Sequence, residues 1–160
     1  MLSILDASSG GALHQVKSLF EEYAASLGIA LCFQGFAQEI ATLPGCYAPP
    51  RGRLLLGRWN QEVAGCVALR PLLNGICEMK RLYVRPDYRQ HGVGRALAEQ
   101  VIGEAALAGY SRMRLDSLPS MERAIQLYRR LGFRDVPPYG KNPVPGAVFL
   151  ELPLAGQTTP

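Results

Sequence analysis

The sequence of 160 residues contains no hydrophobic run long enough to cross a membrane. Its longest apolar stretch, Leu27 to Phe33, is far shorter than the roughly 20 residues that a transmembrane helix needs. The first residues, Met1 to Asp6, lack the basic flank and the long apolar segment of a secretion signal. The sequence therefore predicts a soluble protein without a membrane partner, and we expect it in the cytoplasm.

Cysteine and histidine are too widely spaced to predict a metal site. No two of the four cysteines form a C-x-x-C pair, and neither histidine lies at metal-ligand spacing from a cysteine. Cys66 and Cys77 fall inside apolar, strand-like runs, where a free cysteine behaves as a small hydrophobic residue. We expect reduced thiols in the core and no bound metal.

The charge is mildly positive, with a formal net charge of +4, which favours an anionic ligand. Basic residues gather between Arg70 and Arg95 and again between Arg112 and Arg134. A nucleic-acid-binding surface is typically a basic stripe interleaved with aromatic residues. Because the first group includes a glycine-containing loop, a localised anion site explains it at least as well. We expect no nucleic-acid partner, and an anion- or nucleic-acid-binding domain remains an alternative.

The chain has globular composition, with 48% hydrophobic and 19% charged residues, and a length that suits one domain. Hydrophobic periodicity predicts helices over 14–27, 36–43, 93–108 and 120–131, and strands over 54–59, 63–69, 76–84, 113–116, 133–136 and 147–152. Residues 60–62 are expected to form a hairpin turn, and the tail from about residue 155 to be frayed. This order predicts an α+β (mixed α/β) fold around one central twisted sheet, mostly antiparallel and flanked by helices.

A loop with two glycines, Arg89 to Arg95, lies between a predicted strand and a predicted helix. Such a turn can present backbone N–H groups and a helix N-terminus to phosphate oxygens, or it can carry glycine for packing reasons, and spacing alone leaves both open. A dinucleotide-binding pattern would need a third small residue at Leu97. A Walker-type loop would need Gly-Lys-Ser/Thr, which is also missing.

Two segments resemble the GNAT superfamily of N-acetyltransferases. The segment Lys80 to Leu97 is similar to the superfamily signature, whose R/Q-x-x-G-x-G/A core is matched at Arg89, Gly92 and Gly94. The segment Ala124 to Phe133 resembles the second hallmark, A-x-x-L-Y-x-x-L-G-F. Both segments occur in the expected order with a strand between them. The resemblance implies a single N-acetyltransferase domain over residues 1–160 and acetyl coenzyme A as the acyl donor.

The resemblance also implies which residues hold the coenzyme. The backbone of one strand would pair with the pantetheine arm, as an added strand pairs with a sheet edge. The backbone amides of the glycine loop would hold the pyrophosphate. These predicted binding residues are Leu82, Tyr83 and Val84 on the strand, and Arg89, Gln90, His91, Gly92, Val93, Gly94 and Arg95 in the loop.

Two residues are predicted to act in catalysis. The resemblance places Tyr128 as the general acid toward the coenzyme A sulfur, whereas the helix pattern alone would bury it in the core. Glu78 is the predicted base. Because alternate residues of a strand lie on the same face, it is expected to share that face with Lys80 and Leu82. The alternative for Glu78 is an ion pair with Lys80 or with an arginine. Met121 stands where family members often carry an asparagine that contacts the coenzyme.

The acceptor is expected to be a small-molecule or peptide amine, and the resemblance makes a homodimer plausible. Candidate residues of the acceptor site come from the first helices and the late proline-rich loop. They are Tyr23, Phe33, Gln34, Phe36, Tyr139, Lys141 and Asn142. The leading hypothesis is acetyl transfer to a primary amine by direct attack on the thioester. The alternative is a non-catalytic module that senses acetyl coenzyme A.

Overall fold

The computed structural model describes residues 1–27, 35–140 and 142–154. Its elements follow in the order β1 (Leu2–Asp6), α1 (Gly10–Leu27), α2 (Phe36–Thr42), η2 (Gly45–Tyr47), β2 (Arg53–Trp59), β3 (Glu62–Leu73), β4 (Ile76–Val84), η3 (Pro86–Tyr88), α3 (Val93–Leu107), β5 (Arg112–Ser117), α4 (Glu122–Arg130), β6 (Arg134–Asp135) and β7 (Val148–Pro153). None of the helices in these ranges is long and apolar enough to cross a membrane.

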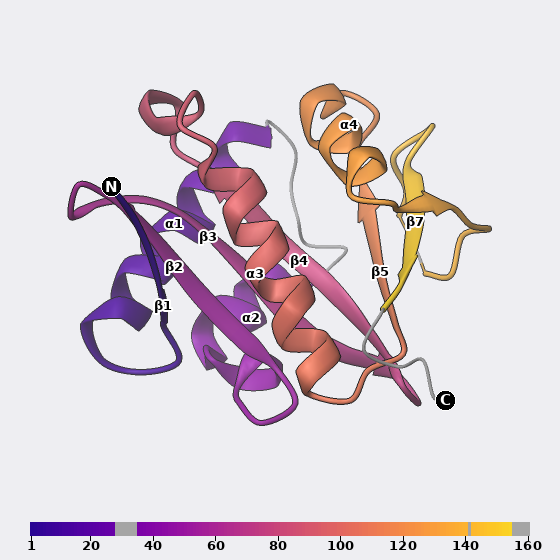
Figure 1. Ribbon diagram of the computed structural model, residues 1–160, viewed down its shortest axis with the longest axis horizontal. Helices are drawn as coiled ribbons and strands as arrows, with labels where there is room; N and C mark the ends of the chain where they lie inside the picture. Colours follow the sequence, from indigo (N-terminus) through magenta and orange to yellow (C-terminus); the bar gives the residue numbers. More distant parts are fainter. Residues whose placement is uncertain (28–34, 141, 155–160) are drawn as a thin grey trace.

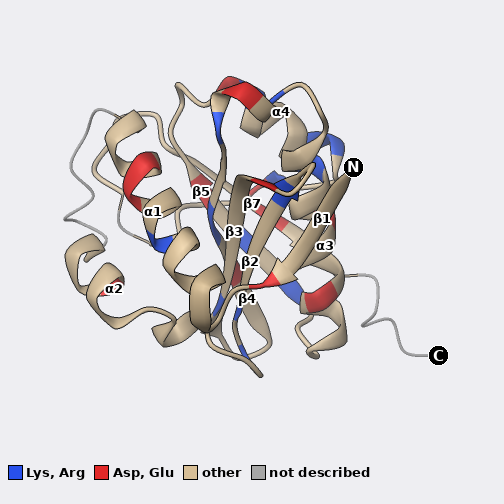
Figure 2. Ribbon diagram, turned by 90° about the vertical axis from the view of Figure 1, so that its left-hand side faces the viewer, with Lys and Arg blue, Asp and Glu red and all other residues tan. Residues whose placement is uncertain are grey.

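One sheet runs through the described chain, with the strand order β1-β2-β3-β4-β5-β7-β6. Every neighbouring pair is antiparallel except β4 and β5, which are parallel because α3 connects them. Helix α3 covers one face of the sheet, and α1 and α2 cover the other (Figures 1 and 2). The predicted fold class, a mixed α/β fold around a mostly antiparallel sheet, is confirmed.

Alternating residues of the central strands feed two separate cores, one on each face of the sheet. On β2, Leu55 packs into the cluster under α3, while Leu54 and Leu56 pack into the cluster under α1. The amphipathic stripe of α3 supplies Leu97 and Val101 to the first cluster, as the helical periodicity predicted. The two cores fix the position of α3 and therefore of the loop that precedes it.

The turn between β2 and β3 confirms the predicted hairpin and corrects its length. Trp59 pairs with Glu62, so the turn consists of Asn60 and Gln61 alone, and Glu62 is already the first residue of β3. Both turn residues have positive φ, 49° and 72°, as the two-residue hairpin turn compatible with strand twist requires.

The edge strand β1 is missing from the sequence prediction. Its five residues, Leu2 to Asp6, show no clean alternation, and the strand exists because it pairs antiparallel with β2 along its whole length. Helix α1 also begins at Gly10, four residues before the predicted start at His14. Both differences arise from contacts with distant residues that a local pattern does not contain.

Candidate active site

A β-bulge interrupts β4 at the centre of the sheet. Arg81 and Leu82 both lie opposite the single residue Val67 of β3, and Arg81 has a φ of +60°. The extra residue reverses the alternation, so Leu82 packs against the α3-side cluster that contains Met79. The prediction that Glu78 and Leu82 share a strand face is therefore wrong, because period 2 does not survive the bulge.

Strands β4 and β5 separate after Glu78, before the bulge. They pair only over Ile76–Glu78 and Arg112–Arg114, although β4 continues to Val84 and β5 to Ser117 (Figure 1). A cavity of about 40 Å³ lies between the separated ends. The edge of β4 that β5 leaves unpaired can accept an extended ligand by strand addition, with the backbone around Leu82 to Val84 as the template.

The glycine loop forms the N-terminus of α3 with the geometry that an anion site requires. Gly92, the N-cap residue, has a φ of +74°, and no atom lies within 4 Å of a Cβ built there. Ala96 is the first residue whose N–H bonds back into the helix, to the Gly92 carbonyl at 3.1 Å. The N–H groups of Val93, Gly94 and Arg95 precede it and have no intrahelical acceptor, so they can bind phosphate oxygens.

Three side chains of this loop are already engaged within the protein. Arg89 donates from Nε to the carbonyl of Val84 at 2.8 Å, which ties the loop to the end of β4. His91 stacks on Trp59 with ring centroids 4.4 Å apart and an interplanar angle of 9°. Arg95 pairs with a glutamate one helical turn later, at 3.2 Å. These contacts shape the loop and leave its backbone amides as the available donors.

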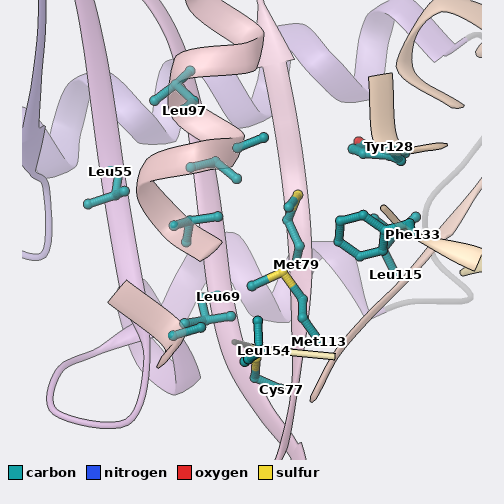
Figure 3. Close-up of a cluster of buried hydrophobic side chains, with 14 of the residues drawn as sticks. Leu55, Leu69, Cys77, Met79, Leu97, Met113, Leu115, Tyr128, Phe133 and Leu154 are labelled. Carbon is teal, nitrogen blue, oxygen red and sulfur yellow. The ribbon is translucent and has the colours of Figure 1, made fainter. Parts of the chain in front are cut away.

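Tyr128 is buried in the core, as the helix pattern predicted, and its role as a general acid stays a prediction. It is 6% exposed within the α3-side core and meets Phe133 edge-on, with centroids 5.8 Å apart (Figure 3). It also lines the small cavity between β4 and β5. Burial raises the pKa of the Tyr128 phenol, so the hydroxyl stays protonated and can act as a proton donor at neutral pH.

Met121 lines the same cavity and begins α4 as its N-cap residue. Its sulfur accepts a hydrogen bond from the Ser117 hydroxyl at 3.7 Å. At this position the chain presents a thioether in place of the amide that family members often carry. Contact with the coenzyme here would be apolar, and the Ser117 hydroxyl is already directed toward Met121.

A second cavity, of about 510 Å³, lies on the side of the sheet that carries α2. Its volume is in the range of small-molecule sites. Its polar wall comes from α2, the following turn, β3, β4, β5 and the late loop. The ionisable and hydroxyl side chains that line it are Glu39, Thr42, Cys46, Tyr47, Arg70, Glu78, Lys80, Asp116 and Tyr139.

The candidate acceptor residues are distributed between the two cavities. Tyr139 lines the larger cavity, and Tyr23 lines the smaller one. Phe36 lies beneath the Arg81 guanidinium, 5.5 Å from its ring centroid, and Asn142 donates to Asp116. The remaining three candidates, Phe33, Gln34 and Lys141, lie outside the described residues.

Glu78 is held on both carboxylate oxygens. Arg70 donates from Nε to Oε1 at 2.8 Å and brings Nη2 within 2.7 Å of the same oxygen, and the Tyr139 hydroxyl donates to Oε2 at 2.7 Å. The Glu78 side chain is 4% exposed. An ion pair with an arginine, the alternative for this residue, is therefore present. Burial, together with the neighbouring Glu78 charge, raises the pKa of Tyr139, which keeps this donor protonated.

A second buried ion pair ties α2 to the bulge. Arg81 donates to Glu39 from Nη2 at 2.7 Å and from Nε at 3.0 Å, and its side chain is only 2% exposed. The Tyr47 hydroxyl donates to the same carboxylate at 3.0 Å. The outer wall of the larger cavity is thus anchored to the strand that carries the bulge.

The sequence prediction missed Arg81, Glu39 and Asp116 as components of the site. A usable signal existed for Asp116, because β5 alternates apolar Met113 and Leu115 with charged Arg114 and Asp116. That alternation places Asp116 on the face away from the α3-side core. No local pattern could have joined Glu39 to Arg81, which are 42 residues apart.

Comparison with known proteins agrees with this geometry. The model of the acetyltransferase (GNAT) family matches residues 16–133, so the chain belongs to that family. An uncharacterised N-acetyltransferase of Schizosaccharomyces pombe is 39% identical over 145 residues, covering 89% of each chain.

Two solved structures extend the comparison. A putative acyl-CoA N-acyltransferase of Klebsiella pneumoniae superposes with a TM-score of 0.76 at 28% identity, over 96% of this chain and 98% of that one. A GNAT family acetyltransferase of Elizabethkingia anophelis, crystallised with acetyl-CoA bound, has a TM-score of 0.55 at 25% identity and covers 64% of this chain and 76% of that one. The family supports acyl transfer as the class of reaction.

Proposed function

We propose that this protein transfers an acetyl group from acetyl coenzyme A to a primary amine. The observation that carries the proposal is the separation of β4 from β5, which leaves an unpaired edge of β4 between the N-terminus of α3 and the larger cavity. The open N-terminus of α3 lies on one side of the separation, and the cavity of about 510 Å³ lies on the other. A thioester held along β4 would therefore meet an acceptor that enters from the larger cavity.

The chain's residues fit the coenzyme in two places. The N–H groups of Val93, Gly94 and Arg95 would bind the pyrophosphate. The phosphates can approach them because Gly92, with its positive φ, carries no side chain. The backbone of Leu82, Tyr83 and Val84 would pair with the pantetheine arm in place of the missing β5 partner. When bound, the coenzyme supplies the acetyl group as a thioester.

Tyr128 would protonate the leaving sulfur. Its hydroxyl lines the cavity between β4 and β5, and burial keeps it protonated. A backbone N–H near Leu82 or Tyr83 would stabilise the negative charge on the carbonyl oxygen, an interaction that can contribute about 3 kcal/mol.

A role for Glu78 as the base stays a prediction. Both of its oxygens already accept hydrogen bonds, so an incoming amine would share them with Arg70 and Tyr139 or reach the carboxylate through a water molecule. A Glu78→Gln variant with a changed pH–rate profile would support the base role. An unchanged profile would leave Glu78 as a residue that positions Arg70 and Tyr139.

The proposal is tested by following coenzyme A thiol release with a panel of small and peptide amines, with products identified by mass spectrometry. Tyr128→Phe is expected to lower kcat by about 100-fold while the affinity for coenzyme A is retained. Tyr110→Phe is the matched control, because Tyr110 lies in the same core cluster but lines neither cavity. Binding of acetyl coenzyme A without thiol release across the panel would instead support a sensor. Full turnover by folded Tyr128→Phe would remove Tyr128 from the mechanism.

A further inference from the structure

Three carboxylates line the larger cavity, and they differ in what occupies their oxygens. Glu78 accepts from Arg70 on Oε1 and from Tyr139 on Oε2. Glu39 accepts from Arg81 on both oxygens. In these two side chains every oxygen already accepts a hydrogen bond from the protein, so a ligand would have to share each oxygen with a protein donor.

Asp116 is different. Its Oδ2 accepts from the Asn142 amide at 3.0 Å. Within the described ranges its Oδ1 has no donor at hydrogen-bonding distance, and the nearest cation, Nζ of Lys80, lies 4.0 Å away. The Asp116 side chain is only 12% exposed, so Oδ1 is a largely desolvated acceptor. A buried carboxylate oxygen in this state binds a cationic donor strongly.

The position of Asp116 is also distinctive. Of the three carboxylates, Asp116 alone lines both the larger cavity and the small cavity that contains Tyr128. Lys80 is the other ionisable side chain common to the two cavities. The carboxylate therefore lies where an acceptor in the larger cavity would meet a thioester held beside Tyr128.

We propose that Oδ1 of Asp116 binds the ammonium group of the acceptor, which makes the substrate class a small amine that is cationic in solution. This inference rests on the acetyltransferase function proposed above. Bound in this way, the acceptor passes one N–H proton to Oδ1, which leaves a neutral amine that can attack and a neutral carboxyl group. Among the described residues no protein donor shares Oδ1 of Asp116, whereas each oxygen of Glu78 is already engaged by one.

Nearby groups support a cationic acceptor nitrogen at this point. The two arginines beside the cavities are each directed to another carboxylate: Arg70 of the larger cavity to Glu78, and Arg81 of the smaller cavity to Glu39. Burial lowers the pKa of Lys80, whose Nζ lies 4.0 Å from Oδ1 of Asp116.

The test compares acceptors of different charge on Asp116→Asn. The asparagine keeps an oxygen for the Asn142 contact but removes the negative charge. The acceptors are matched pairs such as benzylamine, which is cationic at neutral pH, and aniline, which is neutral. Asp135→Asn is the control, because Asp135 is an aspartate 68% exposed on β6 and lines neither cavity. Asp116→Ser gives the same comparison with a smaller side chain, should the amide disturb folding.

We expect Asp116→Asn to lower kcat/KM for the alkylamine by about 10- to 100-fold, through both a higher KM and a lower kcat, because the amide neither pairs with the ammonium nor accepts its proton. The value for the arylamine should change by less than about 3-fold. Asp135→Asn should leave both values unchanged. An equal loss for both acceptors would overturn the proposal, since it would show only a structural role. Thiol release by neither the wild type nor any variant would instead reject the acetyltransferase function itself.

Discussion

The buried pair between Arg81 and Glu39 allows a quantitative test of how the cavity wall is held. We consider the variants Arg81→Met and Glu39→Leu and the double variant. The wild-type pair is bidentate, at 2.7 Å and 3.0 Å, and the two side chains are 2% and 13% exposed. Each single change leaves one largely buried charge without this counter-charge, whereas the double change removes both charges together.

The magnitude follows from burial. Removing one partner of a buried ion pair costs about 3–5 kcal/mol, because the remaining charge keeps its desolvation penalty. In the double variant the desolvation penalty disappears, and packing of the introduced Met and Leu side chains restores part of the lost stability. We therefore expect each single variant to lose about 3 kcal/mol of unfolding free energy, with a coupling energy of about 2 kcal/mol between the two sites.

The assay is urea unfolding followed by circular dichroism, with one cycle for this pair and a second cycle for Arg95 and Glu99. The second pair also joins an arginine to a glutamate, at 3.2 Å, but its side chains are 54% and 52% exposed. Its coupling should stay below about 0.5 kcal/mol, as for other exposed pairs one helical turn apart. Similar coupling energies in the two cycles would refute the argument that burial makes the Arg81–Glu39 pair strong.

Two further predictions concern the loop and the last strand. Gly92→Ala should lower the unfolding free energy by about 1 kcal/mol because of the φ of +74°. Gly94→Ala, whose Cβ would lie 3.5 Å from a Val84 methyl group, should change it by less than about 0.5 kcal/mol. Urea unfolding measures both values, and equal losses would contradict this prediction. Burial alone would raise the pKa of Glu151, but hydrogen bonds from Arg114 and Arg112 lower it from its ordinary value of 4.5, so its stabilising contribution is present above that pH and is lost below it. The free energy of unfolding, measured from pH 7 to pH 3, should therefore fall more steeply below pH 4.5 for the wild type than for Glu151→Gln. Parallel plots of this free energy against pH for the two proteins would refute the prediction.

Sequence patterns predicted well those parts of the fold that local interactions determine. The bounds of β4 were predicted to the residue, and α3 to within one residue, because apolar periodicity and flanking glycines mark both. Gly92 was also identified correctly as part of a strand-to-helix turn, since its positive φ is a local property. The family motifs extended this local information to the predicted role of Tyr128, which remains to be tested.

The larger cavity could not be predicted in the same way, because its lining residues come from segments far apart in the sequence, between Gly35 and Phe149. The bulge at Arg81 was equally beyond a local pattern. A positive φ in an arginine is strained by about 1 kcal/mol, and no local sequence signal marks it. The conformation persists because the side chain is fixed by Glu39, 42 residues away. Without the bulge, strict alternation would direct Lys80 and Arg81 to opposite faces. With it, Lys80 lines the larger cavity while Arg81 anchors the helix that walls it. The bulge in β4 thus ties this strand to the helix that lines the larger cavity.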